Sequence, residues 1–247
     1  MDILKLIKSH RSIREFEKAK EPNNHVNIQD IVKTAQQAST SKNLQAYSVI
    51  HVTDKTIKRS ISEVCNQTHV VESHFFLVFC ADLYRLNLVS KSHLKEMKHE
   101  YTELLITAII DTALFAQNVM LISESQGLGG VYVGGIRNDP RKICELLNIP
   151  KLVFPVFGMS LGFPAKKPLL KPRLPLESIF KENYYEDQDE LDKIRQYDEE
   201  MKAYYKKRSS KEKLKEETWS EKVSDIISDE LRPHIKEFLN EQGLLIK

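Results

Sequence analysis

The sequence predicts an α+β protein with helices layered around one β-sheet. Runs of β-branched and aromatic residues of strand length are interspersed with segments whose apolar residues recur at helical spacing. One of the apolar runs is continuous, as in a central strand, and one helical pattern is much longer than the others. The predicted order is two helices, strand, helix, strand, long helix, short strand, helix and strand, which is typical of an α+β layer structure.

The first part of the chain supplies three helices and two strands. The expected helices cover residues 2–9, 28–38 and 54–65, and the expected strands cover residues 47–53 and 75–81. Asn27 is suited to cap the second helix, because its side chain can accept from a free backbone N–H of the first turn. The run 75–81 is apolar throughout and predicts a strand buried on both faces.

The next part supplies the long helix and the remaining strands. The expected helices cover residues 96–126 and 140–147, and the expected strands cover residues 131–133 and 152–161. Gly127 provides a C-terminal stop for the long helix, and Pro140 is suited to the first turn of the following one.

The composition changes after Pro175. Residues 187–247 are highly charged, and we expect helices over 188–205 and 219–241 with a basic loop at 206–211 between them. Such an arm can wrap a partner subunit, and it can equally be a solvated helical tail.

Net charge and cysteine content narrow the possible classes of protein. The 247 residues carry a net charge of +2, so no overall field favours nucleic acid or an anionic membrane. The three cysteines are far apart and show neither metal-ligand spacing nor a disulfide framework. Cys80 lies in the apolar run and is expected to be buried, whereas Cys65 follows a polar helix and is expected to be a passive surface thiol. Cys144 has no partner at a recognisable spacing.

No targeting segment is expected. The apolar stretch at the N-terminus is too short for a signal peptide. The longest apolar segment, 104–122, contains Asp111, Gln117 and Asn118, so it predicts a buried core helix rather than a membrane span. Asp111 is expected to be a hydrogen-bonded buried or capping carboxylate. We therefore expect a cytoplasmic, reduced environment.

A short basic run near the N-terminus is the most informative local feature. His10, Arg11, Ser12 and Arg14 place two guanidinium groups, an imidazole and a hydroxyl within five positions. Such a set suits a phosphate, because guanidinium groups bind its oxygens bidentately. The alternatives are an exposed basic turn and a nucleic-acid contact.

A glycine-rich run at 127–135 resembles a dinucleotide fingerprint at first sight. The required spacing fails because Tyr132 occupies the last glycine position, and a helix precedes the run where a strand is required. Residues 127–130 are typical of a tight helix-to-strand turn. Gly134 and Gly135 follow a strand and can present backbone N–H groups to a planar ligand.

Two further cations, Lys171 and Arg173, lie in a proline-rich stretch at 164–175. Prolines restrict the backbone, so they can hold both cations in fixed positions for a ligand. The alternative is that the stretch is a rigid surface linker. The sequence shows no Ser-His-Asp order, metal cluster or Walker loop. Asp82 is expected to be a strand-end cap. Chemistry borrowed from a cofactor is therefore the natural interpretation.

Taken together, these segments resemble the flavin-dependent nitroreductase family, in its branch of NADPH-dependent nitro and flavin reductases. The resemblance is carried by 10–14 (His-Arg-Ser-Ile-Arg), 39–41 (Ser-Thr-Ser) with Leu44-Gln45, Gln67, 127–138, 170–175, 197–199 (Tyr-Asp-Glu), 204–205 (Tyr-Tyr) and 218–220 (Thr-Trp-Ser). Each motif alone is weak evidence for the family, but the order and spacing of all of them together are specific.

The resemblance implies non-covalent FMN at the interface of an obligate homodimer. It places His10, Arg11 and Ser12 on the phosphate, with Arg173 in support. Arg14 and Lys171 are implied near the N1–C2=O edge of the ring, where fixed cations stabilise the negative charge that a hydride brings. The remaining implied cofactor-binding residues are Thr40, Gln67, Tyr132, Val133, Gly134 and Gly135. Gln67 and nearby loops are expected to come in part from the second subunit.

The implied fold is a mostly antiparallel sheet flanked by helices, with an extended helical C-terminal arm. Residues 1–180 would form the FMN-binding core, and residues 181–247 a charged helical extension of the same domain at the dimer interface or over the active site. The implied activity is an NADPH oxidoreductase that passes a hydride through FMN to nitroaromatics, quinones or free flavin by a ping-pong mechanism, with no catalytic side chain. Lys207 and Arg208, with Lys206, are candidates for the 2′-phosphate of NADPH.

Two other functions are also compatible with the sequence. One is a flavin reductase that supplies reduced FMN to a partner. The other, from a different class, is a basic-patch module that binds nucleic acid or protein and is colourless. A thiol-stress or disulfide reductase is disfavoured because the cysteines offer no redox pair.

Overall fold

A four-stranded antiparallel sheet forms the centre of the molecule. The computed structural model describes residues 2–18, 26–208 and 218–244. The strands are β1 (Tyr47–His51), β2 (Phe75–Asp82), β3 (Gly129–Val133) and β4 (Val153–Gly162), in the order β1-β2-β4-β3. All three pairings are antiparallel. The predicted α+β class and the mostly antiparallel sheet are confirmed.

Helices follow the predicted order, with several short additions. They are α1 (Ile3–Lys8), α2 (Ile28–Ala35), η1 (Ser41–Asn43), α3 (Lys55–Cys65), α4 (His69–Glu72), α5 (Tyr84–Ser92), α6 (Thr102–Ser125), η2 (Gly134–Asn138), α7 (Pro140–Leu147), α8 (Leu176–Ile179), α9 (Glu190–Arg208), α10 (Trp219–Ser228) and α11 (Ile235–Glu241). Asn27 caps α2 as expected: its side chain accepts from the N–H of Gln29. The short η1, α4, η2, α5 and α8 were not predicted.

Two predicted elements of the charged C-terminal part are wrong. The helix expected over 219–241 is divided into α10 and α11, because Pro233 lacks an N–H donor and restricts the residue before it. Lys206, Lys207 and Arg208 lie in the last turn of α9, where basic side chains suit the negative helix end, and not in a loop. The rest of the expected loop, 209–211, lies outside the described residues.

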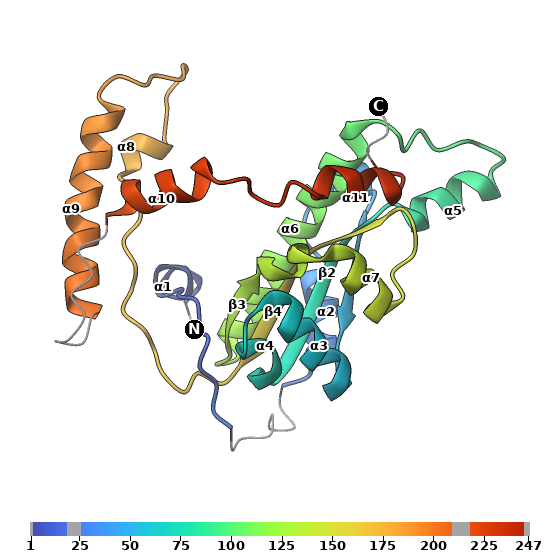
Figure 1. Cartoon of the computed structure of the whole chain (residues 1–247), viewed down its shortest axis with the longest axis horizontal. Coiled ribbons are helices and arrows are strands. Elements are labelled where there is room, and N and C mark those ends of the chain that lie inside the picture. The colour runs from blue at the N-terminus through green and yellow to red at the C-terminus, as the bar shows by residue number, and fades with distance from the viewer. Residues whose placement is uncertain (1, 19–25, 209–217, 245–247) are drawn as a thin grey trace. The chain divides into compact units, whose positions relative to one another are not determined.

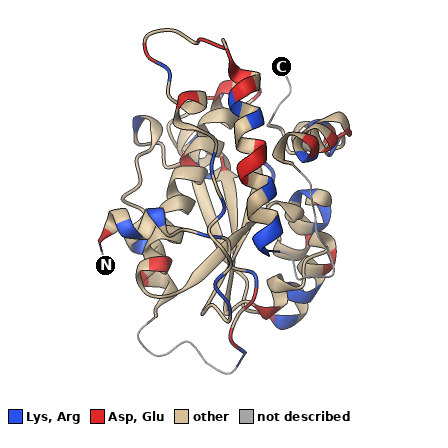
Figure 2. Ribbon diagram, turned by 90° about the vertical axis from the view of Figure 1, so that its left-hand side faces the viewer, with Lys and Arg blue, Asp and Glu red and all other residues tan. Residues whose placement is uncertain are grey.

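The sheet carries an apolar core on each of its faces. Along β2, Phe75, Leu77 and Phe79 pack with residues of α2 and α6, while Phe76, Val78 and Cys80 pack with residues of α3 and α7. Figure 1 labels β2 and these four helices. All residues of β2 are buried, as its continuous apolar run predicted. Figure 2 shows the strands tan almost throughout, with acidic and basic residues on the helices and loops.

Helix α6 is long and apolar enough to cross a membrane by length and composition. It nevertheless lies against the sheet, since Phe115, Ala116, Val119 and Met120 belong to the same core as β2 and β4. It is the predicted core helix, although it begins at Thr102 and not at residue 96.

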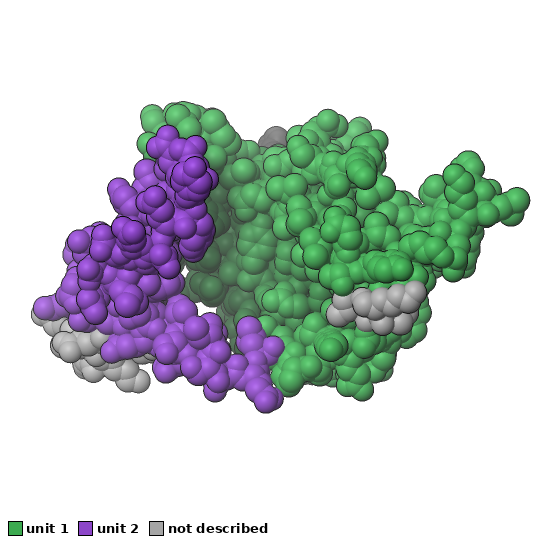
Figure 3. All heavy atoms as spheres, turned by 90° about the horizontal axis from the view of Figure 1, so that it is seen from above, with its two compact units in different colours: residues 1–168, 232–247 green, residues 169–231 purple. Residues whose placement is uncertain are grey.

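The chain divides into two compact units, coloured separately in Figure 3. The first contains residues 1–168 and 232–247, and the second contains residues 169–231. The second unit has its own small core of Tyr197, Met201, Tyr204 and Tyr205. The boundary expected at residue 180 therefore falls inside the second unit.

Candidate functional site

The basic N-terminal run is an extended segment anchored on the sheet. The N–H of Ile13 donates to the carbonyl of Gly130 in β3 at 2.9 Å, and the N–H of Glu17 donates to the carbonyl of Phe163 at 2.9 Å. Ile13 is buried, whereas Ser12 and Arg14 on either side of it are exposed. Because side chains alternate along an extended chain, burying Ile13 directs Ser12 and Arg14 outward.

His10 and Arg11 are held by specific partners. Nδ1 of His10 lies 2.7 Å from Oε1 of Glu124 near the end of α6. Arg11 donates from Nε to the carbonyl of Ser9 at 3.0 Å and from a terminal nitrogen to the carbonyl of Pro168 at 2.9 Å. An arginine has five N–H donors, so these two bonds orient the guanidinium and leave donors for a ligand.

A cavity of about 350 Å³ lies beside this pair. Its lining includes Ser9, Arg11, Glu124 and Lys167, together with Gly127 at the start of the turn into β3. Two cations and a hydroxyl suit an anionic group there. The second oxygen of Glu124 is buried and has no hydrogen-bond partner among the described residues, which leaves one acceptor for a ligand donor.

Arg14 and the turn between α3 and α4 lie in the same part of the first unit. Burial lowers the pKa of His69, and the charge of Arg14 lowers it further, so the two side chains are close enough to interact. Nδ1 of His69 lies 3.2 Å from the hydroxyl of Ser160 in β4. Gln67, at the start of this turn, is half-buried and is fixed by its N–H, which donates to the carbonyl of Ser62 at 3.1 Å. Gln67 thus lies two residues before His69, the histidine that interacts with Arg14.

The strand that leads to the glycine pair is fixed by its side chains. Val133 is fully buried in the core beneath α3 and α7. Tyr132 stacks edge-on against Phe157 and donates from its hydroxyl to Gln117 at 3.2 Å. Burial raises the pKa of Tyr132, so its hydroxyl stays protonated. These side chains are committed to the core, and at Val133 only the backbone is left for a ligand.

The two glycines at the start of η2 have different surroundings. A side-chain carbon at Gly135 would lie 2.9 Å from the backbone of Cys65, so glycine is required for η2 to approach α3. At Gly134 the nearest atom is a terminal nitrogen of Arg137, at 3.4 Å. The first N–H groups of a helix lack partners within it, so Gly134 and Gly135 supply donors at this end of β3.

Replacing Gly135 with alanine is expected to lower the free energy of unfolding by about 1–3 kcal/mol, since the added carbon meets backbone that cannot move aside. Chemical denaturation measures this change. The matched control is Gly134→Ala, where the neighbour is the end of a flexible side chain. Equal stability of the two variants would contradict the packing role of Gly135.

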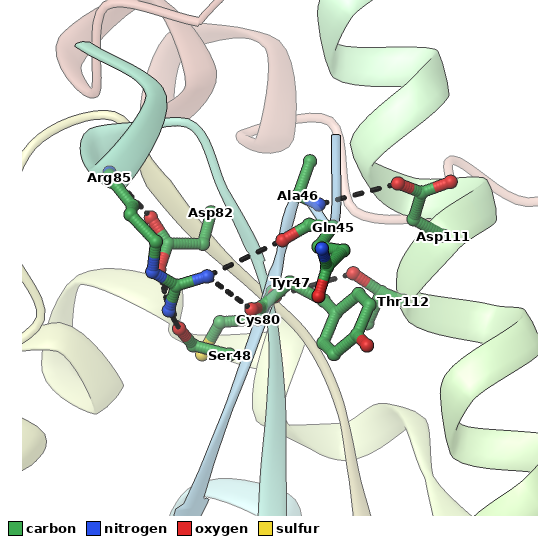
Figure 4. A network of polar contacts seen from close by, with 9 residues as sticks. All are labelled: Gln45, Ala46, Tyr47, Ser48, Cys80, Asp82, Arg85, Asp111 and Thr112. Carbon is green, nitrogen blue, oxygen red and sulfur yellow. Dashed lines mark hydrogen bonds and ion pairs between the residues drawn. The ribbon is translucent and has the colours of Figure 1, made fainter. Parts of the chain in front are cut away.

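The loop that contains Thr40 is organised by a buried carboxylate. Asp111 of α6 is 1% exposed and accepts from the N–H of Ser41 at 3.0 Å. It also accepts from the N–H of Ala46 at 3.3 Å, as Figure 4 shows. Between Ser41 and Ala46, three residues have positive φ: Lys42, Asn43 and Gln45. Residues other than glycine rarely adopt this backbone conformation. The expectation of a hydrogen-bonded buried carboxylate at Asp111 is confirmed, and this carboxylate sets the loop after Thr40.

Asp82 ends β2 as expected. One of its oxygens accepts from the N–H of Arg85 at 3.2 Å, and the other accepts from the hydroxyl of Ser48 at 2.5 Å. Arg85 also donates to the carbonyl of Tyr47 at 3.2 Å, so the group ties β1 to β2 (Figure 4).

The other candidate cations belong to the second unit. Lys171 and Arg173 are exposed, and a terminal nitrogen of Arg173 donates to the carbonyl of Lys171 at 3.2 Å. The hydroxyl of Tyr197 donates to the carbonyl of Pro172 at 2.9 Å, which holds the segment on α9. Lys207 and Arg208 are exposed at the end of that helix.

The cysteines are free thiols with unfavourable thiolate forms. Burial raises the pKa of Cys65 to about 12 and of Cys144 to about 11, and it also raises the pKa of Cys80. Cys80 is buried as expected, but the prediction of a surface thiol at Cys65 is wrong, because Gly135 packs against it. Within the described ranges, no three His, Cys, Asp or Glu side chains gather as metal ligands.

Comparison with known proteins identifies the class of protein. The model of the nitroreductase family matches residues 7–163, and that of the nitroreductase family C-terminal domain matches residues 171–247. The chain therefore belongs to the nitroreductase family.

Individual relatives match over nearly the whole length. The chain is 39% identical to the NADPH-flavin oxidoreductase of Vibrio harveyi over 242 residues, which cover 98% of this chain and 97% of that protein. It is 39% identical over 242 residues to the oxygen-insensitive NADPH nitroreductase of Salmonella typhimurium, with 97% of each chain covered. The solved structure of NfrA1 from B. megaterium superimposes with a TM-score of 0.92 at 39% identity, covering 99% of both chains.

Proposed function

We propose that this protein is an FMN-dependent NADPH oxidoreductase that reduces nitroaromatics, quinones or free flavin by a ping-pong mechanism. The observation that carries the proposal is the full-length similarity to proteins named for NADPH-dependent reduction of flavin and nitro compounds. The test is NADPH oxidation by the purified protein, with menadione, nitrofurazone and FMN as acceptors in turn. Stimulation by these acceptors is expected, and its absence with all three would contradict the activity.

The side chains at the edge of β3 fit FMN by their chemistry. A phosphate needs charge-assisted donors, and Arg11, Ser12 and His10 offer them from one anchored segment, with Arg173 in support. When bound, FMN supplies the acceptor for the hydride of NADPH. Arg14 and Lys171 are assigned to stabilise negative charge on the ring.

The remaining assigned contacts are polar and mostly from backbone. Gly134 and Gly135 offer N–H groups, while Thr40 and Gln67 offer side-chain hydrogen bonds. Tyr132 and Val133 contribute through the strand that leads to the glycine pair. No side chain is required to form a covalent bond or to move a proton in this scheme.

We further propose that the protein is an obligate homodimer, with the charged extension at the dimer interface or over the active site. An exposed apolar stripe on α6 supports the dimer: Ile106, Ile110 and Leu114, spaced four residues apart, are 47%, 52% and 45% exposed. Residues four apart share one face of a helix, and a stripe of this kind favours burial against another chain.

Replacing Ile110 with glutamate is expected to shift the protein from dimer to monomer and to lower its FMN content. A buried carboxylate without a partner is strongly unfavourable at an apolar interface. Sedimentation velocity measures the mass, and absorbance measures the flavin per chain. The control, Leu88→Glu, changes a residue of α5 that is 50% exposed. A dimeric Ile110→Glu protein would exclude this stripe from the interface.

The preference for NADPH is assigned to the basic end of α9, where Arg208 and Lys207 would hold the 2′-phosphate. Arg208→Ala is expected to raise the KM for NADPH about tenfold and to leave the KM for NADH unchanged, since a charge-assisted pair is worth about 1.5–3 kcal/mol. The control is Arg195→Ala, on the same helix, where the arginine already pairs with Asp192 at 2.6 Å. An unchanged ratio of the two KM values would remove Arg208 from the site.

A flavin reductase that supplies reduced FMN to a partner is the second candidate function, favoured by the relative named as an NADPH-flavin oxidoreductase. Release of reduced FMN during turnover distinguishes it from a reductase whose flavin stays bound. A cytoplasmic location fits either activity, because NADPH is its electron donor.

A further inference from the structure

A second cavity, of about 500 Å³, is lined by none of the residues assigned to FMN. Its walls come from the end of β1 with the following turn, the first turns of α3, the end of α4 with the start of β2, and residues 17–18. Four cationic side chains belong to its lining: Lys18, Lys55, Lys58 and Arg59. The acidic residues in the lining are Glu17 and Glu72. Glu17 already interacts with another group of the protein.

Lys58 is the unusual group in this cavity. It is only 8% exposed, and its ammonium donates to the carbonyl of Ser73 at 2.5 Å. Among the residues that the structure describes, no carboxylate forms an ion pair with it. An ammonium has three donors, so within residues 2–18, 26–208 and 218–244 this one bond leaves donors of Lys58 without an acceptor and its buried charge without a counter-ion.

The environment of Lys58 changes its own pKa and that of the neighbouring His51. Burial lowers the pKa of Lys58 to about 8. Burial also lowers the pKa of His51, and the charge of Lys58 lowers it further, so the histidine across the cavity does not compensate the lysine. A buried cation that lacks an anion is expected to be stabilised when one binds.

Two more cations share this face of α3. Lys55 and Arg59 are four residues apart and lie on the same side of the helix as Lys58. Like charges at this spacing repel each other and destabilise a helix, whereas a bound anion turns the repulsion into attraction. The guanidinium of Arg59 adds a planar fork suited to a phosphate.

We propose that this cavity binds a phosphate dianion, free or as a small phosphate ester, with Lys58 as its buried cation and Arg59 as its forked donor. The cluster of several cations from one helix turn favours a dianion over a single carboxylate, and the volume leaves room for a group esterified to the phosphate. This cavity uses none of the residues assigned to FMN, and only the saturation with FMN and the NADPH control in its test rest on the proposed function.

Calorimetry on FMN-saturated protein tests the proposal, since FMN fills the other phosphate site. The probes are inorganic phosphate, glycerol 3-phosphate and succinate, in a buffer free of phosphate and sulfate. At least one phosphate probe is expected to saturate below about 10 mM and to bind more tightly than succinate. Tighter binding of glycerol 3-phosphate than of inorganic phosphate identifies an ester as the ligand, and the reverse order identifies the free ion. No saturation by either phosphate probe, or tighter binding of succinate, would overturn the proposal.

Variants locate the binding. Lys58→Met keeps the apolar stem and removes the charge, and it is expected to weaken phosphate binding at least about tenfold. Arg59→Gln is expected to weaken it similarly, while Lys33→Met, which changes an exposed lysine of α2, leaves it unchanged. NADPH oxidation is expected to stay the same in all three. Unaltered phosphate binding in Lys58→Met would overturn the proposal.

A measurement on the unaltered chain covers the case in which Lys58→Met fails to fold. Trace labelling with acetic anhydride as a function of pH, followed by mass spectrometry, gives the pKa of individual amines. We expect a pKa of about 8 for Lys58 without phosphate and a higher value with it, because an anion stabilises the charged form. Labelling of Lys33 should not respond. A Lys58 pKa that is insensitive to phosphate would overturn the proposal independently of any variant.

Discussion

Replacing Arg11 with alanine is expected to raise the dissociation constant for FMN about 10- to 100-fold, since a hydrogen bond between charged groups contributes about 1.5–3 kcal/mol. The guanidinium is oriented by the carbonyls of Ser9 and Pro168, so the ligand meets a preorganised cation. Titration of the apoprotein with FMN, followed by quenching of flavin fluorescence, measures the constant.

The control for this variant is Lys8→Ala, which removes an exposed cation three residues away in α1. It separates a specific phosphate contact from the general effect of positive charge. Equal weakening by Lys8→Ala and Arg11→Ala would show that only the local field acts. FMN affinity unchanged in Arg11→Ala would remove Arg11 from the site.

Replacing Asp111 with alanine is expected to lower the free energy of unfolding by about 3 kcal/mol, because two backbone N–H groups lose a charged acceptor. For a protein of this size that corresponds to a fall in Tm of about 6–12 °C. Differential scanning calorimetry measures it. The loop after Thr40 has residues with positive φ and depends on this acceptor, so FMN affinity is expected to fall as well.

Two further variants make this result specific. Asp111→Asn keeps one acceptor and is expected to lose less stability than Asp111→Ala. Asp30→Ala changes an exposed carboxylate in the first turn of α2 and is expected to stay within about 1 kcal/mol of the unaltered protein. If Asp111→Ala were as stable as Asp30→Ala, the carboxylate would not be what holds the loop.

Most of the fold could be predicted from the sequence alone, because the length of the apolar runs and the spacing of apolar residues indicate which segments are buried strands and helices. The continuous apolar run of β2 predicted a strand with helices on both faces, and the structure places Phe76 and Phe79 in different cores. The role of Asp111 could also be predicted, because a carboxylate within an apolar helix is expected to be buried and must then accept hydrogen bonds from nearby donors. In each case the decisive interaction is encoded by the residue and its immediate neighbours.

Other features depend on partners distant in the sequence. Cys65 looked exposed because it follows a polar helix, and its burial comes from Gly135, which only the tertiary fold brings near it. The approach of Arg14 to His69 likewise arises from the docking of an extended segment on β3. The break between α10 and α11 could have been predicted from the sequence, since Pro233 lies between the two helices.

An anaerobic visible spectrum before and after addition of stoichiometric NADPH measures whether this chain accepts a hydride on a bound flavin. We expect an oxidised-flavin spectrum with one FMN per chain that bleaches promptly on addition of NADPH. A colourless protein that also fails to bind added FMN would contradict it. That outcome would return the basic run at 10–14 to the binding-module alternative, whose nucleic-acid affinity should fall steeply with salt.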